Sequence, residues 1–130
     1  MDAATEAVDP RPLSAPERDL IGRMLDYAFD PGASAALREQ LAALRVVARC
    51  TCGCPSLFFD PPPDQAGARR EMVADLYGAT PEGHAVGLLL WAVAGGLEYL
   101  EVYTLGVWPP YSLPVAVTVT PEYPSGPHAA

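Results

Sequence analysis

The chain contains no lysine, and this absence limits what it can bind. All eight basic residues are arginines, and the formal net charge is −8. After Arg70 there are six carboxylates and no further arginine. Because affinity for phosphate requires a cationic surface, the composition argues against nucleic acid as a partner. The acidic second half favours a cationic partner through electrostatic steering, although such acidity can also serve only to keep a protein soluble.

Long apolar segments and a targeting signal are also missing. The longest apolar run, residues 85–97, is too short to cross a bilayer, and the acidic N-terminus has no apolar signal region. Three cysteines, an odd number, do not fit the disulfide framework of a small secreted domain. Half of the 130 residues are hydrophobic, so a single domain with a substantial core is available. We therefore expect a cytoplasmic protein with no membrane contact.

The sequence also lacks the short motifs of common enzyme classes. It has no glycine-rich phosphate loop, no Ser-His-Asp order, no HExxH and no paired CxxC. The only histidines are His84 and His128, and the second lies in the proline-rich tail, where we expect no role. We predict no catalytic residue and no cofactor. A small-molecule enzyme is the third hypothesis, and it would require a deep cavity around Glu101.

Residues 85–105 are the segment around which we expect the fold to be organised. Two apolar runs are joined by Gly95-Gly96, a pair typical of a β-hairpin turn. A turn at these glycines predicts that Trp91 lies opposite Leu100, and it fixes every other pair of the hairpin. Both faces would be largely apolar, which is typical of a central position in a sheet.

Two helices are predicted ahead of the strands. Ser14 and Glu17 have the spacing of a capping box, and apolar residues then recur at helical intervals until Asp30-Pro31-Gly32 ends the helix. A second helix is expected over residues 34–44. Each has one narrow apolar stripe, so each should lie against one face of a sheet.

The remaining pattern predicts that sheet. We expect strands at residues 45–51, 56–60 and 71–79, then the hairpin, and finally an edge strand at 115–120. Residues 1–11 and 121–130 are expected to be disordered tails, which leaves one domain over 12–120. The predicted fold class is α+β, with two N-terminal helices packed on one face of a four- to five-stranded, mostly antiparallel meander sheet.

Cys50, Cys52 and Cys54 are the first candidate site. In an extended strand they would stand about 6.6 Å apart at each step, too far to hold one ion unless Gly53 folds Cys54 back. If it does, the three thiols with His84 or a carboxylate as fourth ligand would form a zinc site. Two other hypotheses stay open: reduced residues that are small and buried or at a strand edge, and a nucleophilic or redox-active thiol.

Glu101, between two tyrosines, marks the second candidate site. A carboxylate on an apolar and aromatic strand face must be paired, protonated or exposed. Tyrosine and arginine on an open face are typical of protein interfaces. The alternatives are a structural Arg–Glu pair beside core tyrosines, and catalysis. The residues predicted to form a partner-binding patch away from the helices are Arg49, Asp75, Tyr77, Tyr99, Glu101 and Tyr103.

These features favour a non-enzymatic protein-interaction module. It would use its acidic, tyrosine-bearing sheet face to bind a cationic protein, in the manner of toxin-neutralising immunity proteins, or to bind itself as a homodimer. The two charges of Arg69-Arg70 are expected to be solvated in a loop. The second hypothesis is a metal-binding protein that uses the cysteine cluster.

Three short motifs together resemble small cytoplasmic proteins of an actinobacterial type. They are Pro12-Leu13-Ser14 before the first helix, the segment Arg49 to Pro55 (Arg-Cys-Thr-Cys-Gly-Cys-Pro) and Leu100-Glu101-Val102-Tyr103. The resemblance covers roughly residues 12–110. It supports the order of elements and the cytoplasmic setting, and it carries no known activity to transfer to this chain.

Overall fold

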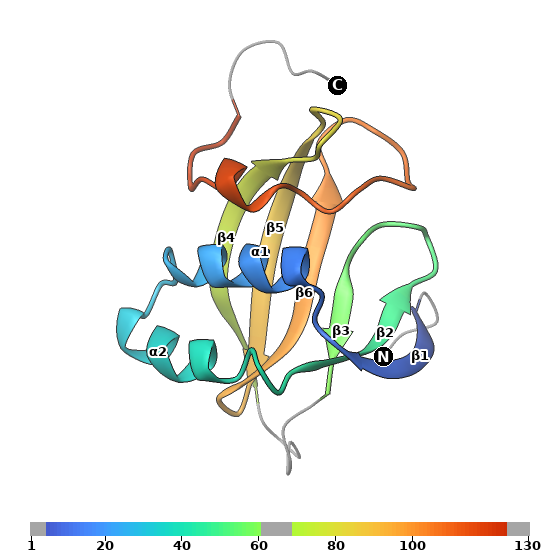
Figure 1. Cartoon of the computed structure of the whole chain (residues 1–130). Helices are drawn as coiled ribbons and strands as arrows, with labels where there is room; N and C mark the ends of the chain where they lie inside the picture. Colours follow the sequence, from blue (N-terminus) through green and yellow to red (C-terminus); the bar gives the residue numbers. More distant parts are fainter. Residues whose placement is uncertain (1–4, 61–68, 125–130) are drawn as a thin grey trace.

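A computed structural model describes residues 5–60 and 69–124, which form two α-helices and a six-stranded antiparallel sheet (Figure 1). The elements in chain order are β1 (Thr5–Pro12), α1 (Ala15–Leu25), α2 (Pro31–Glu39), β2 (Arg45–Cys50), β3 (Leu57–Phe59), β4 (Arg70–Ala79), β5 (Ala85–Val93), β6 (Gly96–Thr104) and the 3-10 helix η1 (Ala116–Thr118). The α+β class is confirmed. The sheet has six strands rather than four to five.

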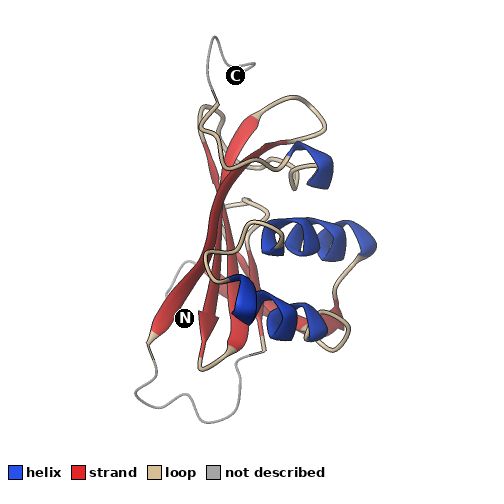
Figure 2. Ribbon diagram, turned by 90° about the vertical axis from the view of Figure 1, so that its left-hand side faces the viewer, coloured by secondary structure: helices blue, strands red, loops and turns tan. Residues whose placement is uncertain are grey.

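The strand order is β1-β2-β3-β6-β5-β4, so the sheet is not a simple meander. Strand β3 pairs with β6, and β4 lies at the far edge beyond the β5–β6 hairpin. The helices and η1 lie on one side of this sheet (Figure 2). In the described part of the chain, neither α1 nor α2 has the length and apolar character that a membrane-spanning helix needs.

The core lies between the helices and this face of the sheet. Leu20, Ile21 and Met24 of α1 are fully buried against Leu88 and Leu90 of β5, in one continuous apolar cluster. Side chains alternate along a strand, so the residues between these positions of β5 point to the opposite side of the sheet. The helices therefore cover one sheet face and leave the other without a helix in the described residues (Figure 2).

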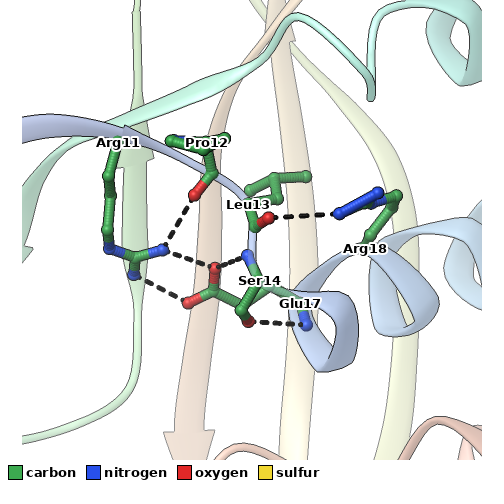
Figure 3. A network of polar contacts seen from close by, with 6 residues as sticks. All are labelled: Arg11, Pro12, Leu13, Ser14, Glu17 and Arg18. Carbon is green, nitrogen blue, oxygen red and sulfur yellow. Dashed lines mark hydrogen bonds and ion pairs between the residues drawn. The ribbon is translucent and has the colours of Figure 1, made fainter.

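The start of α1 is fixed by the predicted capping box. The backbone N–H of Glu17 donates to Ser14 Oγ at 3.3 Å, and the backbone N–H of Ser14 donates to Glu17 Oε1 at 2.8 Å. The Glu17 carboxylate also accepts two hydrogen bonds of 2.8 Å from the Arg11 guanidinium (Figure 3). One carboxylate thus caps α1 and ties it to the end of β1.

The second helix begins earlier and ends earlier than the predicted range of 34–44. Asp30, which was expected to end the first helix, instead caps α2, because its Oδ1 accepts from the N–H groups of Gly32 and Ala33. Pro31 occupies the first turn, where a missing N–H has no cost. Asp30-Pro31-Gly32 therefore closes the loop that follows α1 and begins α2.

The prediction of a disordered tail over residues 1–11 is wrong from Thr5 onward. Residues 5–12 form β1, an edge strand paired antiparallel with β2. Its side chains are mostly exposed. The alternation of apolar and polar residues that indicates a half-buried strand is therefore missing from its sequence. Residues 1–4 lie outside the described part, as do residues 125–130 of the predicted C-terminal tail.

The hairpin is present, but its predicted register is wrong by one residue. The turn is Ala94-Gly95, with φ of 51° and 80°, and Val93 pairs with Gly96. The register then shifts between Trp91 and Ala92. Beyond this irregularity, Trp91 pairs with Tyr99 rather than with Leu100. Because a shift of one residue exchanges the two faces, this register decides which side chains point away from the helices.

The predicted edge strand at 115–120 is replaced by η1, which lies beside α1, and by a single bridge between Tyr77 and Thr120. The Thr118 hydroxyl accepts from the Ala79 N–H at 2.9 Å and lies 2.6 Å from the Val115 carbonyl oxygen. A side chain thus takes the place of ladder hydrogen bonds at this edge of β4.

Candidate functional sites: an aromatic sheet face and a thiol cluster

The sheet face opposite the helices carries a continuous group of aromatic and acidic side chains, which we call the outer face. Directly paired residues on neighbouring strands point to the same side of a sheet, so the ladder defines the members of this face. They are Phe58, Met72, Asp75, Tyr77, Leu89, Trp91, Tyr99, Glu101 and Tyr103.

These residues lie in three rows across the strands. The first row runs from Phe58 through Tyr99 to Trp91, and the Phe58 and Tyr99 rings stack with centroids 4.3 Å apart. The second row joins Glu101, Leu89 and Asp75. The third row joins Tyr103, Gly87 and Tyr77. Five of the six predicted patch residues therefore share one face.

Arg49 is the predicted patch residue that the structure places elsewhere. It pairs with Leu57, which in turn pairs with Leu100 of the core, so Arg49 lies on the helix side of the sheet. There it forms an exposed ion pair with Glu6 of β1, at 2.5 Å. A bulge between Val46 and Ala48 reverses the faces of β2 and accounts for the wrong placement.

Arg70 is a member of the site that the sequence analysis missed. It is the first residue of β4 rather than a solvated loop residue, and its Nε lies 2.7 Å from Glu98 Oε1. Its guanidinium carbon lies 5.9 Å from the ring centroids of both Trp91 and Tyr99. An arginine is thus already held here by one carboxylate and two aromatic rings. The signal in the sequence was its position directly before a strand.

Asp75 and Glu101, in the next row of the outer face, have no such cation among the described residues. Asp75 is exposed and takes part in none of the ion pairs found there. Glu101 Oε1 accepts a hydrogen bond from the Trp91 indole N–H at 3.3 Å. Two carboxylates thus lie on a half-buried aromatic surface with no neutralising charge from the described residues.

The phenols of Tyr99 and Tyr103 have raised pKa values. Burial, with the Glu101 charge as the next cause, raises the pKa of Tyr99 to about 12. Burial also raises the pKa of Tyr103, followed by the electrostatic effect of Tyr77 and Asp75. These hydroxyl groups are therefore neutral hydrogen-bonding groups at physiological pH.

The three cysteines form the second site, which we call the thiol cluster. Gly53 has a φ of 97°, a left-handed conformation, and it folds the chain back after β2. As a result the sulfur atoms of Cys50, Cys52 and Cys54 all lie within 4.8 Å of one another. The condition for convergence, a turn at Gly53, is thus met.

Hydrogen bonds fix these sulfurs relative to the backbone. The Cys50 thiol donates to Cys52 Sγ at 2.9 Å, and the Cys54 N–H donates to the same sulfur at 3.3 Å. The Cys54 thiol donates to Ser56 Oγ at 3.3 Å, and that hydroxyl is itself bound to the backbone of Val102. All three cysteines are free, and Cys52 is exposed.

The proton distribution within the cluster is uneven. Burial, followed by the neighbouring Cys52 sulfur, raises the pKa of the Cys50 thiol to about 12. The hydrogen bond from Cys50 and that from the Cys54 backbone lower the pKa of Cys52. Cys52 therefore ionises more readily than Cys50.

His84 does not join the cluster. It lies in the β4–β5 turn, where its backbone N–H donates to Thr80 Oγ1 and its carbonyl accepts from the Thr80 N–H. Within residues 5–60 and 69–124, the group of ligand atoms that converges on the cysteines contains no histidine or carboxylate. The predicted fourth ligand is thus absent from the described geometry.

Comparison of the chain with protein-family models, with curated proteins and with solved structures finds no match.

Proposed function

We propose that the chain is a non-enzymatic protein-interaction module whose outer face binds an arginine-bearing, cationic segment of another protein. The observation that carries the proposal is the position of Arg70 over Trp91 and Tyr99 beside Glu98. The face already holds one guanidinium by ring and carboxylate contacts. Two further carboxylates, Asp75 and Glu101, lie with Tyr103 on the same face and have no cation among the described residues.

The surface chemistry supports a partner rather than solvent alone. Aromatic side chains carry much of the binding energy at protein interfaces, and arginine is their frequent counterpart. The outer-face rings are half-buried, so a partner needs to remove only their remaining surface from water. The net charge of −8 would steer a cationic partner towards the chain.

A second copy of this chain is the less favoured occupant. Two copies that met through this face would bring Asp75 and Glu101 of each close to the same carboxylates of the other. Like charges at an interface are destabilising unless a cation separates them. The charge of the face therefore favours a cationic partner over self-association.

The test is calorimetric titration with a short synthetic peptide in which arginine alternates with valine. The variant Asp75→Asn/Glu101→Gln removes the two outer-face charges, and Asp19→Asn/Glu39→Gln removes two exposed charges from the helices. Both variants change net charge equally. We expect the outer-face variant to lose about tenfold in affinity and the control to stay within about twofold.

Equal losses in the two variants would contradict the proposal, because only net charge would then matter. Sedimentation of the free protein supplies the second outcome. A stable dimer that Asp75→Asn/Glu101→Gln strengthens would assign the outer face to a second copy of the chain and overturn the cationic partner.

A further inference from the structure

We propose that Cys50, Cys52 and Cys54 bind one soft, thiophilic metal ion through their three sulfurs, and that Cu(I) is the ion that suits the site best. The proposal is independent of the outer-face partner, since it rests on different residues. It is carried by the convergence of the three sulfurs within 4.8 Å at the Gly53 turn.

The spacing of the sulfurs is close to what one ion requires. Metal–thiolate bonds are about 2.3 Å long, so two sulfurs on one ion stand roughly 3.8–4.0 Å apart. The sulfur–sulfur distances of the cluster lie around this value: the sulfurs of Cys50 and Cys52 are 2.9 Å apart, and all three lie within 4.8 Å of one another. We expect rotation of the cysteine side chains to bring the three sulfurs to this spacing around one ion.

The donor set selects the class of metal. Thiolates prefer soft ions such as Cu(I), whereas a structural zinc site takes four protein ligands. The described residues offer three sulfurs and no fourth ligand at the cluster. Three thiolates complete the coordination of Cu(I), while Zn(II) would need an additional ligand from outside this set.

Two backbone N–H groups and an exposed cysteine favour an ion held by thiolates at the cluster. The N–H groups of Cys52 and Cys54 point at the sulfurs of Cys50 and Cys52, at 3.5 and 3.3 Å, and such donors stabilise negative charge on sulfur. Ser56 is almost fully buried, and its hydroxyl oxygen accepts the hydrogen bond from the Cys54 thiol, which fixes the position of that sulfur. Cys52 is exposed, so an ion can enter from solvent.

The experiment titrates the reduced full-length protein with Cu(I) under anaerobic conditions, in competition with a chromogenic Cu(I) chelator. We expect one equivalent to bind, with X-ray absorption showing three sulfur neighbours. Each of Cys50→Ser, Cys52→Ser and Cys54→Ser should weaken binding by at least about 100-fold, because each removes a ligand. Thr51→Ser, in the same turn, keeps all three sulfurs and should change affinity less than about twofold.

Three outcomes would overturn the proposal. The first is less than about 0.2 equivalents of bound Cu(I) in protein whose three thiols are shown to be free by alkylation. The second is binding that survives Cys54→Ser, which would leave only a two-thiol contact. The third concerns the choice of ion: Zn(II) that Cu(I) fails to displace would overturn the assignment of Cu(I). Circular dichroism of each variant confirms that the fold is retained.

Discussion

The ring of Tyr103 lies directly over the backbone of Gly87. A Cβ atom at position 87 would stand 1.9 Å from the Tyr103 Cζ atom, inside the ring's own volume. Glycine in the middle of a strand is normally unfavourable, but here it provides the space into which an aromatic side chain of the next strand packs. The position of a central outer-face tyrosine thus depends on the absence of one methyl group.

Replacing Gly87 with alanine is expected to displace the Tyr103 ring and to lower the free energy of unfolding by about 1–3 kcal/mol. Urea unfolding measures the loss. In the Tyr103→Ala background the same substitution should cost much less, because the clash is gone. Gly22→Ala in α1, where the nearest contact of a new Cβ is 3.7 Å, should instead stabilise by about 0.5–1 kcal/mol. A similar loss from Gly87→Ala in both backgrounds would contradict this account.

The hairpin turn predicts opposite behaviour at two neighbouring glycines. Gly95 has a φ of 80° and Gly96 is not among the glycines with positive φ, so Gly95→Ala should cost about 1–3 kcal/mol and Gly96→Ala much less. Ala94, at a φ of 51°, is strained, and Ala94→Asn should stabilise by about 0.5–1 kcal/mol. Thermal unfolding distinguishes the variants. A larger loss at Gly96 would restore the turn first predicted from the sequence.

The contact of Arg11 with Glu17 predicts a pH-dependent stability. Burial alone would raise the pKa of Glu17, but hydrogen bonds from Arg11 and from the Ser14 backbone outweigh it and lower that pKa (Figure 3). A carboxyl whose pKa is lower in the folded state contributes stability above its unfolded pKa, and loses it as pH falls through the folded value.

Glu17→Gln should therefore reduce the free energy of unfolding by about 1–3 kcal/mol at neutral pH, and the difference from the parent protein should shrink in acid. Chemical unfolding across this pH range measures both effects. Glu39→Gln, an exposed carboxylate near the end of α2, is the control and should have little effect. A loss at Glu17 that stays constant down to the lowest pH would show that its charge is not what stabilises the contact.

The features that could be predicted from the sequence are local ones. The Ser14–Glu17 capping box involves residues three positions apart, so its pattern is visible in the chain and the structure confirms it. The convergence of the cysteines can also be predicted on the condition that Gly53 folds the chain back, because one backbone angle decides it. Apolar periodicity likewise predicted α1, β2, β4 and the hairpin strands.

The features that could not be predicted depend on pairing between distant segments. Strand β1 gains its order from β2, which follows some forty residues later, and its own side chains are mostly exposed. The position of Arg49 depends on a bulge in β2, and that of Trp91 on an irregularity in β5. Each of these shifts by one residue reverses a strand face, and no local propensity encodes it.

The most direct test of the outer face as a binding surface is to map the arginine–valine peptide onto the protein by two-dimensional NMR. We expect the backbone shifts to concentrate in β4, β5 and β6, around Asp75, Glu101 and Tyr103, and to leave α1 and α2 unchanged. The affinity for the peptide should fall as the salt concentration rises, since charge contributes to the contact. Shifts confined to the helices, or spread evenly over every acidic residue, would contradict the assignment of the outer face as the binding surface.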